Sequence, residues 1–417
     1  MKTFTYFLIF ITVLVNYCLH ASWTSSAADV LVRSSGIETY AWGYYPPHIN
    51  ADGTVLAFSE RDSSDMNYNL KVYERADNSS DWLLTLDTLI GNISEGIAMN
   101  AAGTAIVTES SADDTSSDIS LWEKISISGW TNSNFLLPDE FENPMHFVMS
   151  ADGTKIAVNC NQRQTDSTTS QNVIIVLTFS NNQLIQIGNT ISLVDSVSNG
   201  FYEYKISADG NNLIIGPSWS PASVPDAGSP IIPVKVYQLR DGLWKQVGNS
   251  LYPETQFEKF GSMVGISSNG QKIAISSPTK DTINGVSTGR VGVYELQENT
   301  WELIGDYING HSPADSMGHS FKINSFGNRI AIGAAIHSSY AGHIRVFDYT
   351  DGFWNQVGDA INGAPGSDDG IGTRFTMSSD GGTIASMNLP FFSSVLPQQS
   401  ILKTYQLSAP NNDGSIE

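Results

Sequence analysis

VMSADGTKIAV, residues 148–158, reads as two short apolar segments joined by a tight turn. The turn is Asp152-Gly153, because Asp-Gly supplies the positive φ angles that a tight hairpin turn requires. The flanking residues show the alternating or continuous apolarity of strands with buried faces. The segment therefore predicts a β-hairpin that must be covered by other parts of the chain.

The same line occurs seven times along the sequence. The copies are HINADGTVLAF, AMNAAGTAIVT, VMSADGTKIAV, KISADGNNLII, GISSNGQKIAI, KINSFGNRIAI and TMSSDGGTIAS, with the shared glycines Gly53, Gly103, Gly153, Gly210, Gly270, Gly327 and Gly381. An apolar residue stands four places before and three places after every one of these glycines, which indicates a repeated core contact. The position three before the glycine is always Asn or Ser: Asn50, Asn100, Ser150, Ser207, Ser267, Asn324 and Ser378. We expect these side chains to hydrogen-bond the turn backbone rather than a ligand.

A second hairpin follows in most copies, as in VKVYQLRDGLWKQVG and VGVYELQENTWELIG. Trp244, Trp301 and Trp354 occupy its last strand, Trp82 and Trp130 hold the comparable place in the first two copies, and Leu184 replaces the Trp in the third. Two hairpins make a four-stranded sheet, and repeats of 50 to 60 residues are typical of propeller blades. We expect the tryptophans to fill the core or space the blades.

The seventh copy ends after its third strand, Ile401 to Leu407, without a Trp-bearing fourth strand. Val30-Leu31-Val32 lies before the first copy with no partner of its own, and pairing it there would remove an exposed sheet edge. The fold predicted is all-β: a seven-bladed β-propeller with four-stranded antiparallel blades, its ring closed by an N-terminal strand in the last blade.

The N-terminus resembles a secretory signal peptide, because Lys2 precedes an apolar stretch from Phe7 to Leu19 and then small residues. This stretch is too short for a transmembrane helix of roughly 20 residues. The domain prediction is a leader at 1–21, with cleavage extending as far as 28, a propeller at 29–408 and a short tail at 409–417. The tail lacks the hydrophobic segment of a lipid-anchor signal.

The composition is acidic, with 42 Asp and Glu against 21 Lys and Arg and a net charge of -21. Such a charge repels phosphate backbones and anionic membranes, so nucleic acid is not an expected partner and the mature chain has no expected membrane span. Removal of the leader leaves Cys160 as the single cysteine, and we expect a buried thiol in a monomeric protein stabilised by its core rather than by a disulfide.

These residues give the chain a resemblance to the FG-GAP, or integrin-α-like, propeller repeats. Phe260-Gly261 followed by Ile275-Ser-Ser-Pro278 is similar to the family's Phe-Gly to Gly-Ala-Pro pattern, and Ile332-Gly-Ala-Ala335 matches it in part. The SADGTKIA lines also resemble the WD40-like repeats of TolB-type propellers. Both resemblances imply protein or glycan contact. Calcium binding in the FG-GAP family needs an Asp-rich loop, and the Ala-Asp-Gly turns here are too short to supply six oxygens, so we expect no metal ion or cofactor.

No catalytic residues are predicted. Gly285-Val-Ser-Thr-Gly289 has the spacing of a nucleophile elbow but leads into a strand rather than a helix. The histidines show no metal-binding spacing, although those near inner strands could meet in space. Paired channel carboxylates of the kind glycosidases use are not expected, since the nearest acids to the inner strands, Glu95 and Glu203, stand at strand starts. Asp-rich loops at 110–118 and 366–370 are expected to be solvated connections.

The function predicted is a secreted or cell-surface, non-catalytic propeller that binds an extracellular protein or glycan through its loops. The alternative is a secreted polysaccharide hydrolase or lyase acting at the propeller channel. Asn78 and Asn92 begin Asn-Ser-Ser and Asn-Ile-Ser and are candidate glycosylation sites.

Overall fold

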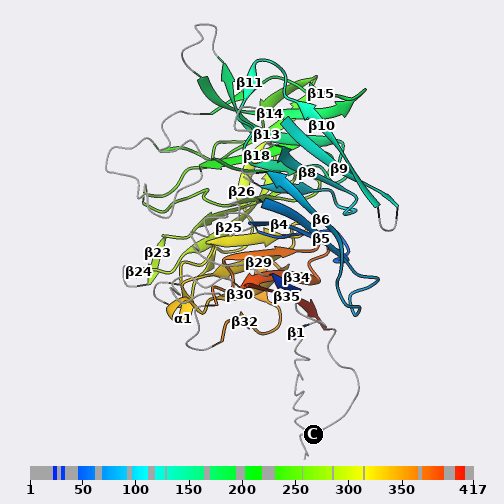
Figure 1. The fold of residues 1–417 in the computed structure, drawn as a ribbon. Coiled ribbons are helices and arrows are strands. Elements are labelled where there is room, and N and C mark those ends of the chain that lie inside the picture. Colours follow the sequence, from blue (N-terminus) through cyan, green and yellow to red (C-terminus); the bar gives the residue numbers. More distant parts are fainter. Residues whose placement is uncertain are drawn as a thin grey trace, which may run out of the picture.

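The computed structural model confirms a seven-bladed β-propeller (Figure 1). It describes residues 22–25, 30–32, 46–61, 68–91, 96–110, 118–126, 129–163, 170–193, 202–217, 231–255, 257–283, 286–312, 315–364, 369–388 and 400–408. Each blade is an antiparallel sheet whose four main strands run from the axis to the rim, in chain order in blades 1 to 6 as the repeat predicted.

The first three blades are built as follows. Blade 1 contains β3 (His48–Ile49), β4 (Val55–Arg61), β5 (Tyr68–Glu74) and β6 (Leu83–Gly91). Blade 2 contains β7 (Ile97–Met99), β8 (Ala105–Ser110), β9 (Asp118–Ser126) and β10 (Gly129–Leu136). Blade 3 contains β12 (Phe147–Met149), β13 (Lys155–Arg163), β14 (Ser170–Ser180) and β15 (Gln183–Gln186), with β11 (Phe141–Glu142) on β13 and β16 (Ile191–Ser192) on β14.

The next three blades follow the same order. Blade 4 contains β17 (Tyr202–Ile206), β18 (Asn212–Pro217), β19 (Lys235–Arg240) and β20 (Leu243–Gln246). Blade 5 contains β21 (Val264–Ile266), β22 (Lys272–Ser277), β25 (Arg290–Gln297) and β26 (Thr300–Leu303), and β27 (Ile308–Asn309) pairs with β25. A small separate hairpin of β23 (Asp281–Ile283) and β24 (Val286–Ser287) lies between β22 and β25 in the sequence. Blade 6 contains β28 (Ser320–Ile323), β29 (Arg329–Ala334), β30 (His343–Thr350) and β31 (Phe353–Gln356), with β32 (Ile361–Asn362) on β30 and α1 (His337–Tyr340) between β29 and β30.

Blade 7 joins both ends of the chain. It contains β33 (Arg374–Met377), β34 (Thr383–Asn388) and β35 (Ser400–Leu407), and its outer edge is formed by β1 (Trp23–Ser25) and β2 (Val30–Val32), which both pair with β35. Figure 1 shows β1 and β35 at the same edge of the molecule. The predicted Val30–Val32 strand is therefore present, and the additional β1 starts at Trp23, before the boundary of 29 expected for the propeller.

A closed ring of backbone hydrogen bonds encircles the axis at the seven Asp-Gly-type turns. In every blade the residue two before the shared glycine donates its N–H to the carbonyl of the equivalent residue in the next blade: Ala51, Ala101, Ala151, Ala208, Ser268, Ser325, Ser379 and back to Ala51, at 2.8 to 3.1 Å. Seven such bonds close on themselves only if the repeats form a complete circle, so the ring is not an open row of repeats.

The Asn and Ser side chains before each turn bond the backbone, as predicted. Asn50 Oδ1 accepts from the N–H groups of Thr54 and Val55 at 2.8 and 2.9 Å, and Ser267 Oγ accepts from Lys272 N–H at 2.9 Å. Asn100, Ser150, Ser207, Asn324 and Ser378 make the equivalent bonds. The shared glycines all have positive φ, between 66° and 79°, which explains why no other residue type fills that place.

Tryptophans on outer strands connect one blade to the blade before it. The indole Nε1 of Trp244, Trp301 and Trp354 donates to the carbonyls of Ile187, Val247 and Ile304, at 2.9 to 3.1 Å. In blade 7 the same bond runs from Trp23 Nε1 to Val357 O at 3.2 Å. Trp23 is therefore the tryptophan that the seventh copy lacks at its C-terminal end, supplied from the other end of the chain.

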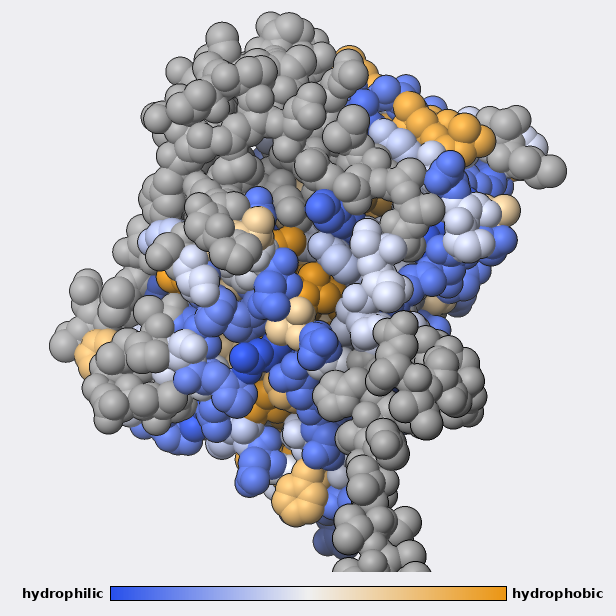
Figure 2. Space-filling model, turned by 90° about the horizontal axis from the view of Figure 1, so that it is seen from below, coloured by the Kyte–Doolittle hydropathy of each residue, from blue (hydrophilic) through white to orange (hydrophobic). Residues whose placement is uncertain are grey.

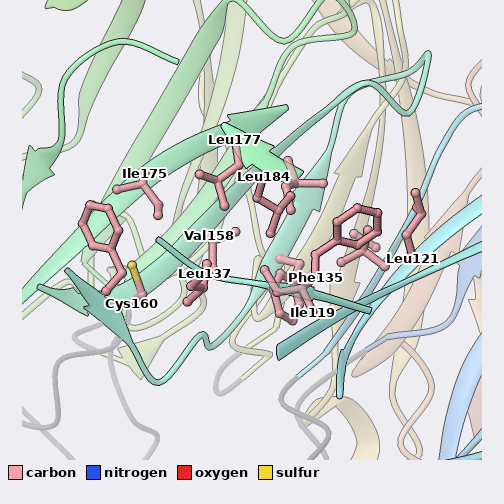
Figure 3. Packing of buried hydrophobic residues seen from close by; sticks show 14 of the residues in the cluster. Ile119, Leu121, Phe135, Leu137, Val158, Cys160, Ile175, Leu177 and Leu184 are labelled. Carbon is pink, nitrogen blue, oxygen red and sulfur yellow. The ribbon is translucent and has the colours of Figure 1, made fainter. Parts of the chain in front are cut away.

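The core lies between the blades. Figure 3 shows one of these layers, in which Ile119, Leu121 and Phe135 of blade 2 meet Val158, Leu177 and Leu184 of blade 3. Apolar faces that no single blade can cover are buried in this way all around the ring. Among the residues coloured in Figure 2, which shows the molecule from below, hydrophilic ones predominate and apolar ones form separate patches.

Cys160 lies at one end of the layer in Figure 3 as a fully buried free thiol. Burial raises the pKa of its thiol to about 12, so almost no reactive thiolate is present at neutral pH. We expect the native protein to resist iodoacetamide for hours at pH 8 and to be alkylated at once in 6 M guanidinium, as read by intact mass. Rapid alkylation of native protein would contradict the buried position.

Candidate functional site

Titratable side chains on or next to the innermost strands gather around the propeller axis, where this fold has its central channel. The innermost strands touch one another around the ring. Those of blades 1, 3, 4 and 6 bring together His48, His146, Glu203, Lys205 and Lys322, whose charges act on one another. This cluster is called the channel cluster below.

Burial dominates the electrostatics of the channel cluster. It lowers the pKa of His48 to about 3 and that of His146 to about 4, and the nearby ammonium groups of Lys205 and Lys322 lower both further. Both imidazoles are therefore neutral at pH 7. The pKa of Lys322 falls to about 8, first through burial and then through repulsion by Lys205.

The positive charges of the channel cluster are only partly balanced. Glu203 forms an ion pair with Lys205, and the positive charges around it keep the pKa of its carboxyl below its usual range in spite of burial. Among the residues that the structure describes, Lys322 has neither an ion pair nor a hydrogen bond. Two ammonium groups therefore face one carboxylate within a protein of net charge -21.

The fully buried Tyr204 holds His146 in place. It lies on the opposite face of β17 from Glu203 and Lys205, because side chains alternate along a strand. Its hydroxyl donates to the carbonyl of His146 and accepts from Asn159 N–H, and its ring contacts the His146 imidazole edge to face at 4.9 Å. The core of blades 3 and 4 thus fixes one wall of the channel.

A second group of cationic side chains surrounds His319, just before β28. Burial lowers the pKa of this imidazole, and the charges of Lys259 and Arg374 lower it further. Arg374 begins β33, so cationic groups continue around the channel at the end where the inner strands begin.

The other end of the inner strands carries mixed charge, because Arg75, Lys155 and Arg329 lie close to the aspartates of its turns. The residue before the shared glycine is an aspartate in four of the blades: Asp52, Asp152, Asp209 and Asp380. Their carboxylates accept hydrogen bonds within their own turns, as Asp209 does from Ser207 Oγ and Asn211 N–H. These aspartates are therefore held by their own turns and by neighbouring cations.

The candidate residues named from the sequence lie in different parts of the protein. Glu203 and two of the histidines, His48 and His146, do meet at the axis, whereas Glu95 and Asn92 lie outside the described residues. Ser287 of the Gly-Val-Ser-Thr-Gly motif lies in the two-residue strand β24 and donates to Thr279 O at 3.2 Å, without a following helix. Asn78 Oδ1 accepts from Arg75, and Asn78 Nδ2 donates to Asp52 O at 3.4 Å.

Sequence reasoning missed Lys205 and Lys322, although a signal was present. Both stand five residues before the shared glycine, as does His48, while the other copies have Ala98, Val148, Gly265 and Thr376 there. Comparing this position across the repeats would have shown the uneven distribution of cations. In the described part of the chain, no group of three or more His, Cys, Asp or Glu side chains is arranged to hold a metal ion.

Comparisons with known proteins support the fold alone. No family model matches the sequence, and no curated protein matches it. A hydrazine synthase chain of Kuenenia stuttgartiensis has a similar structure, with a TM-score of 0.55 at 14% identity over 91% of this chain and 99% of that chain. A complex of KlAtg21 with the coiled coil of AgAtg16 gives a TM-score of 0.52 at 14% identity, covering 88% and 99%.

A third similar structure is the periplasmic gluconolactonase PpgL of Pseudomonas aeruginosa, with a TM-score of 0.50 at 12% identity, covering 86% of this chain and 97% of that one. At these identities the likeness concerns the propeller architecture. Within the described residues, no helix is long and apolar enough to cross a membrane.

Proposed function

We propose that the chain is an exported binding propeller, secreted or held at the cell surface, whose channel binds the acidic group of an extracellular protein or glycan without changing it chemically. The observation that carries this proposal is the ammonium group of Lys322, which has no hydrogen-bond or ion-pair partner among the described residues, where Glu203 is the one carboxylate whose charge acts on it. Lys322 is partly buried and its charged form is disfavoured there, so an anionic ligand group would offset that cost.

The surroundings of Lys322 also favour recognition of an anion. His48 and His146 are neutral at pH 7 and offer ring N–H groups, and the Glu203–Lys205 pair adds a further ammonium group. Export rests on the leader at 1–21, which lies outside the described residues.

The relation to the FG-GAP repeats is part of the same proposal. Phe260, the first residue of its Phe-Gly pattern, packs in the core between blades 4 and 5, and Gly261 N–H donates to Ser276 O at 2.9 Å. The pattern therefore has a structural role here that is compatible with such a repeat. One of the similar structures is a complex with a coiled coil, which is consistent with protein binding by this fold.

A second candidate is the channel hydrolase or lyase. It is favoured by the displaced pKa values of four groups in one place, a feature that active sites share. Glu203 is the one carboxylate of the channel cluster and is held by Lys205, so the paired carboxylates of a glycosidase are not found among these residues. A gluconolactonase among the similar structures makes a lactone a reasonable addition to a substrate panel.

Lys322→Met tests the binding proposal. We expect the variant to bind acidic ligands about 10- to 100-fold more weakly, because a hydrogen bond to a charged group contributes about 1.5–3 kcal/mol. The measurement is calorimetric titration with carboxylated and matched neutral oligosaccharides, and with acidic and neutral peptides, at two salt concentrations.

Lys245→Met is the matched control, since Lys245 is exposed on β20 and pairs with Asp241 away from the channel. It should leave the affinity unchanged. Equal binding of acidic and neutral ligands, unaffected by Lys322→Met, would rule the proposal out. Turnover of a polysaccharide or lactone that Glu203→Gln abolishes would favour the second candidate.

A further inference from the structure

A carboxylate–histidine pair lies on blade 6, outside the channel cluster. Asp315 Oδ1 is 2.7 Å from His337 Nδ1, and its carboxylate is almost completely buried. Asp315 Oδ2 accepts from the backbone N–H groups of His311 and Ser312, at 3.2 and 2.9 Å. The carboxylate is therefore held by two backbone N–H groups and orients the imidazole with Nδ1 toward it.

The other ring nitrogen of His337 is available to a ligand. The His337 side chain is 26% exposed, and within the described residues Nε2 has no hydrogen-bond partner and is not a buried atom. An imidazole held at Nδ1 by a buried carboxylate, with Nε2 open to water, has the arrangement of a general base.

Two buried donors without partners accompany this pair. His343 Nε2 and Arg345 Nε are both buried and have no hydrogen-bond partner in the described part of the chain. The two residues point to the same face of β30, because they are two positions apart. The His343 ring lies 4.3 Å from that of His337, centroid to centroid. The charges of His337, Arg345 and Asp315 act on it, and that of His311 acts most weakly.

His343 is a neutral donor rather than an acid. Burial lowers the pKa of His343 to about 4, and the neighbouring His337 and Arg345 lower it further. A neutral imidazole N–H and a guanidinium N–H that lack partners suit an oxygen on which negative charge develops. An unpaired buried donor costs free energy, and an oxygen ligand would remove that cost for both groups.

The turn that carries His337 has an unusual backbone. Ser338 and Tyr340 have φ angles of 51° and 76°, a conformation that residues other than glycine rarely adopt. Two such residues within four positions are costly, and strain of this kind is concentrated at functional sites. The strained turn presents His337 between Asp315 and His343.

We propose that Asp315, His337, His343 and Arg345 form a hydrolytic site for carboxylic esters. His337 Nε2 takes a proton from a water molecule while the water oxygen bonds to the ester carbonyl carbon. The carbonyl electron pair moves to the oxygen, which receives hydrogen bonds from Arg345 and His343 Nε2–H. The carbon–oxygen bond to the alcohol then breaks, and the leaving alkoxide takes the proton from His337, which yields one acid and one alcohol.

The four residues of this site have different roles. His337, His343 and Arg345 are the catalytic residues, and Asp315 is a positioning residue. An ester is the substrate class favoured, because the step needs one base, one pair of donors and water, with no nucleophile of the protein. The inference goes beyond the proposed function and is independent of it, since none of the four residues belongs to the channel cluster.

The test uses the purified protein with p-nitrophenyl acetate and p-nitrophenyl butyrate, and with bis-p-nitrophenyl phosphate as the phosphodiester. We expect ester hydrolysis faster than that by an equal concentration of free imidazole, with a kcat/KM that rises with pH. His337→Gln should lower kcat/KM by about 10²- to 10⁴-fold and flatten the pH profile. Arg345→Met should lower kcat by about 100-fold.

His311→Gln is the matched control, because it removes an exposed imidazole from the same loop and leaves the backbone N–H that bonds Asp315. It should retain full activity. Asp315→Asn should change the pH profile as well as the rate, which a merely structural role would not do, and circular dichroism checks that each variant is folded. Ester hydrolysis no faster than free imidazole, equal rates in wild type and folded His337→Gln, or cleavage of the phosphodiester alone would overturn the proposal.

Discussion

Trp23→Ala lowers the free energy of unfolding by about 3 kcal/mol, the lower end of the range for truncating a buried tryptophan. The indole packs against the core between blades 6 and 7, and its Nε1 donates to Val357 O. Truncation leaves a void beside Tyr405 and an unpaired carbonyl on blade 6. Because Trp23 is half-buried rather than fully buried, the lower end of the range applies.

Urea unfolding followed by circular dichroism measures this loss. Thr24→Ala is the control, since Thr24 is exposed on the same strand and should change the stability little. Trp354→Ala is the matched comparison, because Trp354 makes the same bond inside the continuous chain, to Ile304 O. A Trp23→Ala midpoint equal to wild type, with Trp354→Ala destabilised, would show that β1 does not close the ring.

The role of Trp23 bears on how the chain is processed. Ser408 N–H donates to Ser22 O at 3.0 Å, so the pairing of the two ends extends to Ser22. Cleavage after residue 21 would keep β1 complete, whereas cleavage after residue 28 would remove it. If the stability prediction holds, export must leave Trp23 in the mature chain.

The repeat predicted most of the architecture because each copy carries its own local information. The Asp-Gly turn, the Asn or Ser before it and the apolar positions around it each specify a hairpin without reference to distant residues. The role of Trp23 was not predicted, because its strand has no turn of its own and its place in the fold is defined only by its pairing with β35. Val30–Val32 was found because its apolarity lacked a local partner.

The two polar sites were harder to predict for a different reason. His48 and Lys322 are neighbours only because the ring closes, and the sequence separation between them gives no local signal. Asp315, His337 and His343 belong to a loop, a short helix and a strand of one blade, so their contact depends on how the loop folds back. Comparing the residues at each position of the repeat across all seven blades reveals the channel cluster. The site around Asp315 and His337 can be recognised only from the three-dimensional structure.

Acid unfolding is the second large effect that we expect. Burial lowers the pKa of His48 to about 3 and of both His146 and His343 to about 4, against an ordinary value near 6.5 that applies in the unfolded chain. Between about pH 6.5 and 4 the unfolded state therefore binds more protons than the native state. The contribution of these histidines to the free energy of unfolding is fully present above pH 6.5 and is lost as the pH falls through this window.

We expect the free energy of unfolding to fall steeply as the pH is lowered. Each such histidine contributes up to about 1.4 kcal/mol per pH unit where only its unfolded form is protonated, so the three together approach about 4 kcal/mol per pH unit near pH 5. His319 acts in the same direction, since burial lowers its pKa also. Lys322 adds nothing here, because its pKa of about 8 lies above the window and both states are protonated.

Urea titrations at half-unit steps from pH 7 to 4.5 measure the slope. His48→Gln, His146→Gln and His343→Gln should each reduce it by about one proton, or about 1.4 kcal/mol per pH unit, because the buried group that must be charged on unfolding is removed. Thr24→Ala, which removes no titratable group, should keep the full slope. A stability that stays flat from pH 6.5 to 4.5 would mean that water reaches these imidazoles, and the neutral, desolvated state assigned to both polar sites would then be wrong.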